Sequence, residues 1–533
     1  MKIVGINKGH NASTTLLDNG EIVFHLENER LSNIKYDKYP FLSINEIKNF
    51  TDHVDKVGLS AISKKEENNL LFQQVGHLTK PINNHGWQAY DLSLKHHFTH
   101  AAHGFYNSGF DKALCIIRDG MGSDYKIDDD RFTTDTYGRE RSATFIASYP
   151  DKFEEIDKEL FVSFDTNGII EKEHIKISNH FSEGLAFEAT CVAMGLNDQE
   201  GGKIMGMSAY GKPNDEIPPI YVNGRINTDL FKFTGDLHTK VLDYKFKDFQ
   251  HQADFAYALQ KETTEHVKNY IYKMVEKTGI KKVILSGGFF LNCVANYEYL
   301  RDDLEIYIEP VAGDGGTSIG VAKYLHHSYT KDMTKRPLKS LYLGPKRTYN
   351  LSKGKKVSYD DVAKLIKDRK IVAIFQGGSE AGPRALGNRS ILYDPTDPNG
   401  KDYVNRVKGR EWYRPFAGTI LQDYQDEYFN MKNLKESPFM MYAVNVKSDK
   451  LPAITHVDKT CRIQTLTKEQ NSHYYNLIEA FRKLTGVPVL FNTSLNLSGD
   501  CINETIEDAL ISLEKSKIDY LYLPEQQLLI NRI

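Results

Sequence analysis

The chain has 533 residues, which is too many for one hydrophobic core, so we expect at least two domains. Hydrophobic residues make up 40% and charged residues 26%, as in ordinary globular proteins, and the net charge of −3 argues against a basic nucleic-acid surface. No apolar run approaches the roughly 20 residues of a membrane helix. The beginning of the chain also lacks the layout of a signal peptide. We therefore expect a cytoplasmic enzyme that is not bound to a membrane.

Short β-rich runs alternate with one long helical pattern in the first half of the chain. "KIVGI" (2–6) is followed by "TTLLDNGEIVFHLE" (14–27), in which Asn19-Gly20 predicts a hairpin. "KALCIIRDGMG" (112–122) and "KKVILSGGFFLN" (281–292) read as buried strands that end in glycine turns. The segment 254–279 has helical apolar spacing and a glycine stop. This pattern predicts an α/β domain that binds ligands at strand ends.

A change of pattern between residues 339 and 350 indicates a domain boundary. The segment "KSLYLGPKRTYN" contains Gly344-Pro345 and has no strong periodicity. A second α/β unit follows, beginning with a helical pattern at 359–370 and a strand pattern at 371–378. We therefore predict domains at 1–343 and 344–533, and we detect no internal repeat in the sequence. The five cysteines show no C-x-x-C spacing, so neither a disulfide framework nor a thiolate zinc site is indicated.

Two glycine-rich turns of the first domain could bind a nucleotide. Gly287 and Gly288 directly follow a strand, with the amide of Asn292 close behind, and Gly313 and Asp314 precede a helical pattern. Such turns leave backbone N–H groups free for an anion. Neither stretch matches the Walker or dinucleotide patterns. Each alone reads as a tight turn, whereas the pair in one domain favours a nucleotide site.

The stretch "KHHFTHAAH" (95–103) is the candidate metal site. His96, His100 and His103 recur at i, i+4 and i+7, on one face of a helix. Asp119 and Asp314 lie in turns at predicted strand ends. Two histidines with two carboxylates suit iron, manganese or zinc better than calcium. The alternative is that the aspartates only form turns and the histidines are solvated.

A dense group of basic residues occupies 380–416 of the second domain. Arginine offers a rigid fork for phosphate or carboxylate oxygens, and lysine a compact charge. A phosphate site, a solvated basic face and a nucleic-acid groove are all compatible with this composition. The group consists of Arg384, Arg389, Arg406, Lys408, Arg410 and Arg414.

Several long blocks together resemble the NodU/CmcH-type O-carbamoyltransferases. They are "GHNAS", "HHFTHAA", "EGGKIMGMSAYG", "GGFFLNCVAN", "AGDGG", "GPRALGNRSIL", "NRVKGREWYRPFA", "THVDKTCRIQT" and "FNTSLN", in the order of that family. The resemblance implies an α/β fold with an ASKHA-type (actin-like ATPase) domain followed by a YrdC-like domain. It also implies that carbamoyl phosphate and Mg-ATP are converted to carbamoyl-adenylate, which carbamoylates a hydroxyl group.

The same blocks imply roles for individual residues. The implied metal ligands are His96, His100, Asp119 and Asp314, with iron or another divalent transition metal as the ion. The implied nucleotide site comprises Lys203, Gly206, Gly287, Gly288, Asn292 and Gly313. The carbamoyl phosphate site comprises Arg384, Arg389, Lys408, Arg414, Arg462, Asn492 and Ser494. Catalytic roles fall to Lys408 and to His10, because histidine is the commonest general base near neutral pH.

Some alternatives remain open from the sequence. Arg118 stands before Asp119 where such blocks usually carry an apolar residue, so it could pair with Asp119 or contact a ligand phosphate. A threonylcarbamoyl-type tRNA-modification enzyme and an actin-like ATP-binding module without carbamoyl chemistry are the rival functions. The acceptor could be a sugar, an aminocyclitol, a macrolactam alcohol or a nucleoside. A homodimer is among the expected assemblies.

Overall fold

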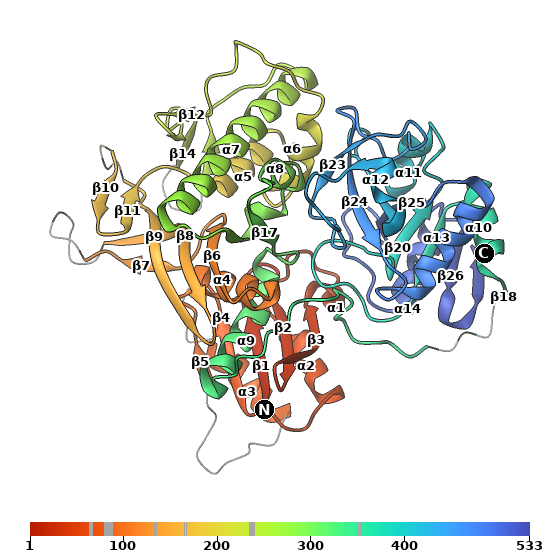
Figure 1. Ribbon diagram of the computed structural model, residues 1–533, viewed down its shortest axis with the longest axis horizontal. Helices are drawn as coiled ribbons and strands as arrows, with labels where there is room; N and C mark the ends of the chain where they lie inside the picture. The colour runs from red at the N-terminus through yellow and green to blue at the C-terminus, as the bar shows by residue number, and fades with distance from the viewer. Residues whose placement is uncertain are drawn as a thin grey trace. The chain divides into compact units, whose positions relative to one another are not determined.

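The computed structural model describes residues 1–62, 68–78, 89–128, 131, 136–164, 166, 168–233, 240–349, 351 and 354–532 (Figure 1). The chain forms two units, which we call unit 1 (Met1–Asn28 and Tyr36–Leu338) and unit 2 (Glu29–Lys35 and Lys339–Ile533). The short segment Glu29–Lys35 thus comes from the first tenth of the chain but belongs to unit 2. Among the described residues, no helix is both long and apolar enough to span a bilayer.

The first sheet of unit 1 has the order β3-β2-β1-β4-β5. β1, β2 and β3 are antiparallel neighbours, whereas β4 runs parallel to β1 and β5 runs parallel to β4. The predicted hairpin is confirmed, because Asn19 and Gly20 both take positive φ, 49° and 86°, between β2 and β3. The strands are β1 Lys2–Asn7, β2 Ser13–Asp18, β3 Glu21–Glu27, β4 Lys56–Ser60 and β5 Ala89–Asp91.

The second sheet of unit 1 repeats this arrangement. Its central order is β9-β8-β6-β16-β17, with β6, β8 and β9 antiparallel and β16 and β17 parallel to β6. This duplicated strand order is that of the ASKHA fold, and it is invisible as a sequence repeat. The strands are β6 Lys112–Arg118, β7 Asp124–Lys126, β8 Tyr137–Ser148, β9 Lys152–Phe161, β10 Ile170–Lys172, β11 Ile175–Ser178, β16 Lys282–Ser286 and β17 Glu305–Ile308.

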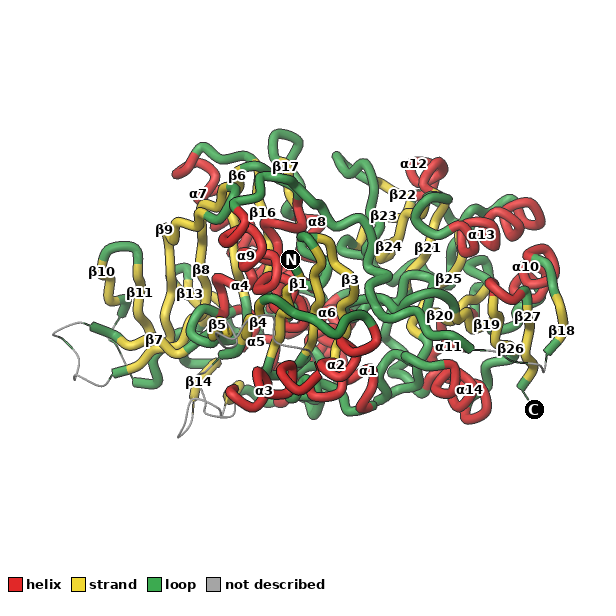
Figure 2. The backbone as a smooth tube through the Cα atoms, turned by 90° about the horizontal axis from the view of Figure 1, so that it is seen from below, coloured by secondary structure: helices red, strands yellow, loops and turns green. Residues whose placement is uncertain are grey.

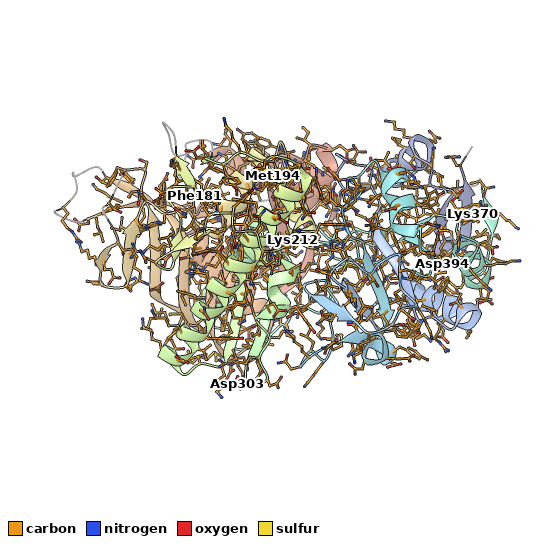
Figure 3. The ribbon with its side chains drawn as sticks, turned by 90° about the horizontal axis from the view of Figure 1, so that it is seen from above. Phe181, Met194, Lys212, Asp303, Lys370 and Asp394 are labelled. Atoms are coloured by element: carbon orange, nitrogen blue, oxygen red, sulfur yellow. The ribbon has the colours of Figure 1, made fainter. Side chains whose placement is uncertain are left out.

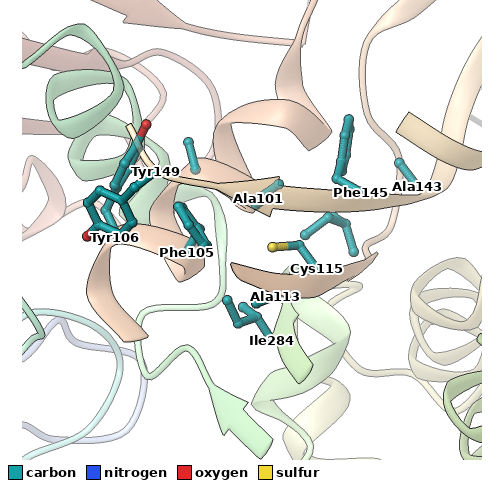
Figure 4. Packing of buried hydrophobic residues seen from close by; sticks show 12 residues of the cluster. Ala101, Phe105, Tyr106, Ala113, Cys115, Ala143, Phe145, Tyr149 and Ile284 are labelled. Atoms are coloured by element: carbon teal, nitrogen blue, oxygen red, sulfur yellow. The ribbon is translucent and has the colours of Figure 1, made fainter. Parts of the chain in front are cut away.

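Two helices lie between these sheets (Figure 2). α9 packs on β1 and β4, α4 packs on β6 and β16, and the two helices pack against each other. The approach of α9 requires a glycine in β1, since a Cβ at Gly5 would lie 1.9 Å from the carbonyl oxygen of Ser318. The α4 side chains Ala101 and Phe105 form a buried cluster with β6 and β8 (Figure 4). The positions of the α4 and α9 N-termini are therefore fixed by core packing.

Capping residues mark both ends of the longest described helix of unit 1. The long helix α7 begins where the Asp248 side chain accepts a hydrogen bond from the His251 N–H and ends at Gly279 in the left-handed region. The helices are α2 Phe41–Asn45, α3 Asn68–Leu78, α4 His96–Ser108, α5 Glu183–Ala193, α6 Gly201–Ser208, α7 Phe249–Thr278, α8 Cys293–Glu298 and α9 Thr317–Thr330. Two small hairpins complete the unit, β12 Tyr221–Val222 with β13 Arg225–Ile226 and β14 Phe231–Phe233 with β15 Lys240–Leu242.

Unit 2 is built on one mixed sheet in the order β18-β27-β26-β19-β20-β25-β21-β24-β23-β22. Lys370 precedes β19 and Asp394 follows β20, so both lie at the same end of this antiparallel pair (Figure 3). The strands are β18 Lys355–Lys356, β19 Val372–Phe375, β20 Arg389–Tyr393, β21 Ala417–Leu421, β22 Phe429–Asn430, β23 Ala443–Val446, β24 Thr460–Leu466, β25 Val489–Ser494, β26 Tyr520–Leu523 and β27 Leu528–Asn531. The helices are α1 Glu29–Ser32, α10 Tyr359–Lys367, α11 Gly400–Lys408, α12 Gln425–Tyr428, α13 Ser472–Thr485 and α14 Ile506–Lys515.

Candidate active site

Four side chains of unit 1 converge on one point. His96 and His100 lie one turn apart at the start of α4, Asp119 follows β6, and Asp314 lies just before α9. One potential ligand atom from each residue lies within 4.8 Å of the other three, and all four residues are buried. The Nε2 atoms of His96 and His100 are 3.2 Å apart. Two imidazole nitrogens facing one another so closely suit a shared cation better than two protons.

The carboxylates complete a balanced arrangement of charge. His96 Nε2 lies 3.2 Å from Asp119 and 3.4 Å from Asp314, and His100 Nε2 lies 3.5 Å from Asp314. Burial opposes a positive charge on His96, but Asp314 and Asp119 outweigh it and raise its pKa to about 10. Burial also opposes the Asp119 carboxylate, yet hydrogen bonds with His100 and His96 hold its pKa well below the usual range. Two nitrogen and two oxygen donors fit a divalent transition metal.

The glycine turns approach this cluster directly. The backbone N–H of Gly288 donates to Asp119 Oδ1 at 3.1 Å. Gly287 has φ of 103°, and a Cβ there would lie 2.2 Å from the carbonyl oxygen of Arg118. His10, in the loop after β1, brings its Nε2 to 3.3 Å from Asp314 Oδ2 while 43% of its side chain stays exposed. His10 is therefore both accessible and close to the carboxylates.

Arg118 forms ion pairs with acids other than Asp119. Its side chain forms ion pairs with Glu183 at 3.2 Å and Glu159 at 3.9 Å and stacks on Tyr270. Successive strand residues point to opposite faces of a sheet, so Arg118 and Asp119 diverge. Arg118 thus belongs to a buried ion-pair network and leaves the Asp119 carboxylate to the histidines.

The other residues predicted to bind the nucleotide differ in what they contact. Asn292 is buried, caps α8 through its Oδ1, and donates to Gln260 at 2.9 Å. Lys203 forms an ion pair with Glu200 at 2.7 Å on α6, the helix that also carries Gly206. Gly313 precedes Asp314 in the turn before α9. The structure therefore brings Gly287, Gly288 and Gly313 to the turns that carry the aspartates, whereas Asn292 stabilises a helix end.

Unit 2 gathers positive charges where α11 ends. Lys408 is buried, and its Nζ donates to the Ser494 carbonyl and, at 3.0 Å, to Asn496 Oδ1. Burial, Arg410 and Arg414 hold the pKa of Lys408 well below its usual range. Like charges that lower one another's pKa lie close together, so this is a site that a bound anion would stabilise.

Arg410 is the residue that sequence reasoning left out of this site. Burial and the nearby Arg414 and Arg462 hold its pKa well below the usual range, and its Nη1 donates to Thr493 at 3.4 Å. Within the described part of the chain, the buried Nε atoms of Arg410 and Arg462 have no hydrogen-bond partner. In the sequence, Arg410 alternates with Trp412 and Arg414, and this spacing could have indicated that Arg410 and Arg414 belong to the same site. Lys408, Arg410, Arg414 and Arg462 together form what we call the cationic cluster.

The other residues predicted to bind carbamoyl phosphate have different surroundings. Strand register places Arg462 and Asn492 on either side of Ala417 in the sheet. The Ser494 hydroxyl donates to Asn496 at 2.6 Å. The half-buried Arg384 lies in the loop between β19 and β20. Arg389, by contrast, is fully buried and donates to the backbone carbonyls of Gln376, Gly377, Asn388 and Glu504.

Family comparisons match both halves of the chain. The carbamoyltransferase N-terminus family matches residues 79–323, and the carbamoyltransferase C-terminus family matches residues 363–531. An uncharacterised protein of Methanocaldococcus jannaschii, MJ1058, is 31% identical over 81% of this chain and 73% of its own length. The chain belongs to the carbamoyltransferase family. The resemblance read from the sequence blocks is thereby confirmed.

Two further proteins are similar to this carbamoyltransferase. The nodulation protein NolNO of Sinorhizobium fredii is 29% identical over 96% of this chain and 78% of its own length. Full-length HypF, solved in a phosphate- and nucleotide-bound form, has a TM-score of 0.37 and 14% identity, covering 62% of this chain and 56% of its own. The family assignment makes this carbamoyltransferase an enzyme of O-carbamoyl transfer, as expected, rather than an actin-like module without carbamoyl chemistry.

Proposed function

We propose that this carbamoyltransferase activates carbamoyl phosphate with ATP and transfers the carbamoyl group to a hydroxyl of a small-molecule, sugar or nucleoside acceptor. The observation that carries the proposal is the cationic cluster of unit 2, where the buried Lys408 lies close to partly exposed arginines. Phosphoryl and adenylyl transfer depend on charge neutralisation and positioning more than on a side-chain nucleophile. The cluster provides that neutralisation.

The first reaction belongs to unit 2 in this proposal. Water cleaves carbamoyl phosphate to carbamate and phosphate, and a carbamate oxygen attacks the α-phosphorus of Mg-ATP. Carbamoyl-adenylate forms and pyrophosphate leaves. Lys408, Arg384, Arg410, Arg414 and Arg462 hold the anionic oxygens, and Asn492 and Ser494 lie beside them. Lys408 stabilises the charge on the leaving phosphate together with Arg410 and Arg414, whose charges act on it.

The second reaction belongs to unit 1. The acceptor hydroxyl attacks the carbamoyl carbon, the bond to AMP breaks, and His10 Nε2 takes the hydroxyl proton. The exposure of His10 and its contact with Asp314 support this role, since a carboxylate partner stabilises the imidazolium that forms. The turns with Gly287, Gly288 and Gly313, together with Lys203 and Gly206 of α6, would bind the adenylate.

The four-residue cluster of unit 1 would hold a divalent metal of the iron class. His96, His100, Asp119 and Asp314 are its ligands in this proposal, because their donor atoms already converge. When bound, such an ion supplies Lewis acidity toward carbonyl or phosphate oxygens. The chain itself orients Asp119 through the Gly288 N–H and orients Asp314 beside His10.

A single-turnover assay that follows pyrophosphate and carbamoylated product together tests the proposal. An acceptor is first found by mass spectrometry, as a hydroxyl compound that gains a carbamoyl group. His10→Asn should still release pyrophosphate but lose carbamoyl transfer by about 10²- to 10⁴-fold. Lys408→Ala should lose both reactions, and His53→Asn, a partly exposed histidine of unit 1, should lose neither. Pyrophosphate release from ATP without carbamoyl phosphate would contradict the proposal.

A further inference from the structure

The loop between β19 and β20 is shaped by side chains rather than by regular secondary structure. Glu380 is buried, and its Oε1 accepts hydrogen bonds from the backbone N–H groups of Leu386, Asn388 and Arg389 at 2.6, 2.9 and 3.2 Å. One carboxylate oxygen thus holds the returning half of the loop. We call residues 380–388, which include Arg384, the Arg384 loop.

The outgoing half of the Arg384 loop is held from a distant part of the sequence. Arg30, in α1 of the segment Glu29–Lys35, donates from Nη2 to the carbonyl oxygens of Gly382 at 2.6 Å and Glu380 at 3.4 Å. Arg30 is only 3% exposed. Burying a guanidinium costs several kcal/mol unless its N–H groups are bonded, so the two carbonyl contacts of Nη2 offset part of that cost.

The hydrogen bond to Gly382 lies close in sequence to Arg384, the candidate anion ligand of this loop. Gly382 has φ of 82°, a conformation that favours glycine, and Arg384 follows two residues later. A loop without regular hydrogen bonds depends on such fixed points for its conformation. The backbone that leads to Arg384 is therefore held by Arg30, which lies 352 residues before Gly382.

We propose that Arg30 is a positioning residue for the anion site of unit 2, holding the Arg384 loop in the conformation that binds carbamoyl phosphate. This inference rests on the proposed function of that site. Arg30 does not touch the substrate; it acts through the backbone of Gly382. The segment Glu29–Lys35 then supports the anion site of unit 2 and does more than connect strands of unit 1.

The test is the affinity of the purified full-length chain for carbamoyl phosphate, measured by calorimetry without ATP. Arg30→Ala should weaken binding by about 10- to 100-fold, the scale of misplaced binding groups. KM for carbamoyl phosphate should rise while KM for ATP stays within about 2-fold, a split that general destabilisation would not produce. Arg482→Ala, which removes a surface arginine paired with Glu479 on α13, is the matched control and should bind as wild type does.

Two measurements separate positioning from a merely structural role. Hydrogen exchange of amides in the Arg384 loop should accelerate in Arg30→Ala, while β26 and β27 keep their protection. Methylguanidinium should restore part of the affinity of Arg30→Ala. If Arg30→Ala does not fold, Arg30→Lys replaces it, with weaker binding and faster loop exchange still expected.

The outcomes distinguish the inference from the proposed function. If wild type and Arg30→Ala bind carbamoyl phosphate equally well, the inference is overturned and the proposed function is not. Equal losses in Arg30→Ala and Arg482→Ala would also overturn it, because they would report general fragility. Failure of wild type to bind carbamoyl phosphate would overturn the proposed function, and the inference with it.

Discussion

The two candidate sites handle charge in opposite ways. In unit 1, two imidazoles meet two carboxylates, and each carboxylate favours the charged form of its histidine neighbour. In unit 2, Lys408 and Arg410 meet other cations, and each disfavours the charge of its neighbours. The two carboxylates of the first cluster favour positive charge between them, whereas the cations of the second favour a bound anion. We therefore expect a cation at the first site and phosphate at the second.

Emptying the unit 1 cluster should have the largest effect. Purified protein should contain about one iron-class ion per chain, and His96→Ala combined with His100→Ala should remove it, because half of the donor set is lost. Elemental analysis measures the metal content. His174→Ala, which removes a partly exposed histidine paired with Glu155, should leave the content unchanged. Full metal content in the double variant would place the ion elsewhere.

Filling the unit 2 cluster should stabilise only that unit. Inorganic phosphate at about 100 times its dissociation constant should add about 2.7 kcal/mol to the free energy of unfolding of unit 2. Amide exchange in β21 and β25 reports this gain, and β1 and β6 of unit 1 should show none. The gain should disappear in Lys408→Ala. Equal protection of both units would contradict the contrast between the sites.

Comparing two arginines of unit 2 sharpens the same distinction. Arg410→Ala should weaken phosphate binding by about 10- to 100-fold without lowering the stability of the unliganded protein, since it relieves repulsion within the cluster. Arg389→Ala should instead lower the free energy of unfolding by at least about 3 kcal/mol, because it leaves several buried carbonyls without donors. Calorimetry and urea unfolding measure the two effects. A stability loss in Arg410→Ala equal to that of Arg389→Ala would refute this assignment.

The smallest effect should come from the acid beside the cluster. Glu411 forms an ion pair with Arg414 at 3.3 Å, and both side chains are partly exposed. Glu411→Gln should tighten phosphate binding by about 2- to 5-fold, because it removes a competing carboxylate while exposed pairs contribute little to stability. Glu427→Gln, on α12 of the same unit, is the control. Weaker binding in Glu411→Gln would show that the acid organises Arg414 rather than competing for it.

Local features of the fold were readable from the sequence. Asn19-Gly20 fixed the β2–β3 hairpin through positive φ, and Gly279 ended α7 as expected. The histidine pair of α4 also follows from spacing alone, since i and i+4 must share a helical face. The meeting of this histidine pair with Asp119 and Asp314 follows from a general rule of α/β folds, in which strand ends lie together at one edge of the sheet.

Features set by tertiary packing could not be read in this way. The duplicated strand order of unit 1 leaves no repeat in the sequence, because many apolar patterns satisfy the same topology. Arg389 and Arg410 look alike in the sequence, yet one is surrounded by carbonyls and the other by cations. The membership of Glu29–Lys35 in unit 2 depends on contacts far along the chain, so local propensity carries no trace of it.

The bond between Arg30 and Gly382 also sets an order of events during synthesis. A ribosome adding about 5 to 20 residues per second would make Gly382 roughly 20 to 70 seconds after Arg30, given their separation of 352 residues. Throughout that interval the flanking strands of unit 1 can pair. The Arg30 guanidinium of α1 has no partner in the Arg384 loop until that loop has been synthesised. Unit 2 is thus the last part of the nascent chain to mature, and it cannot be obtained whole from its own contiguous stretch of the gene.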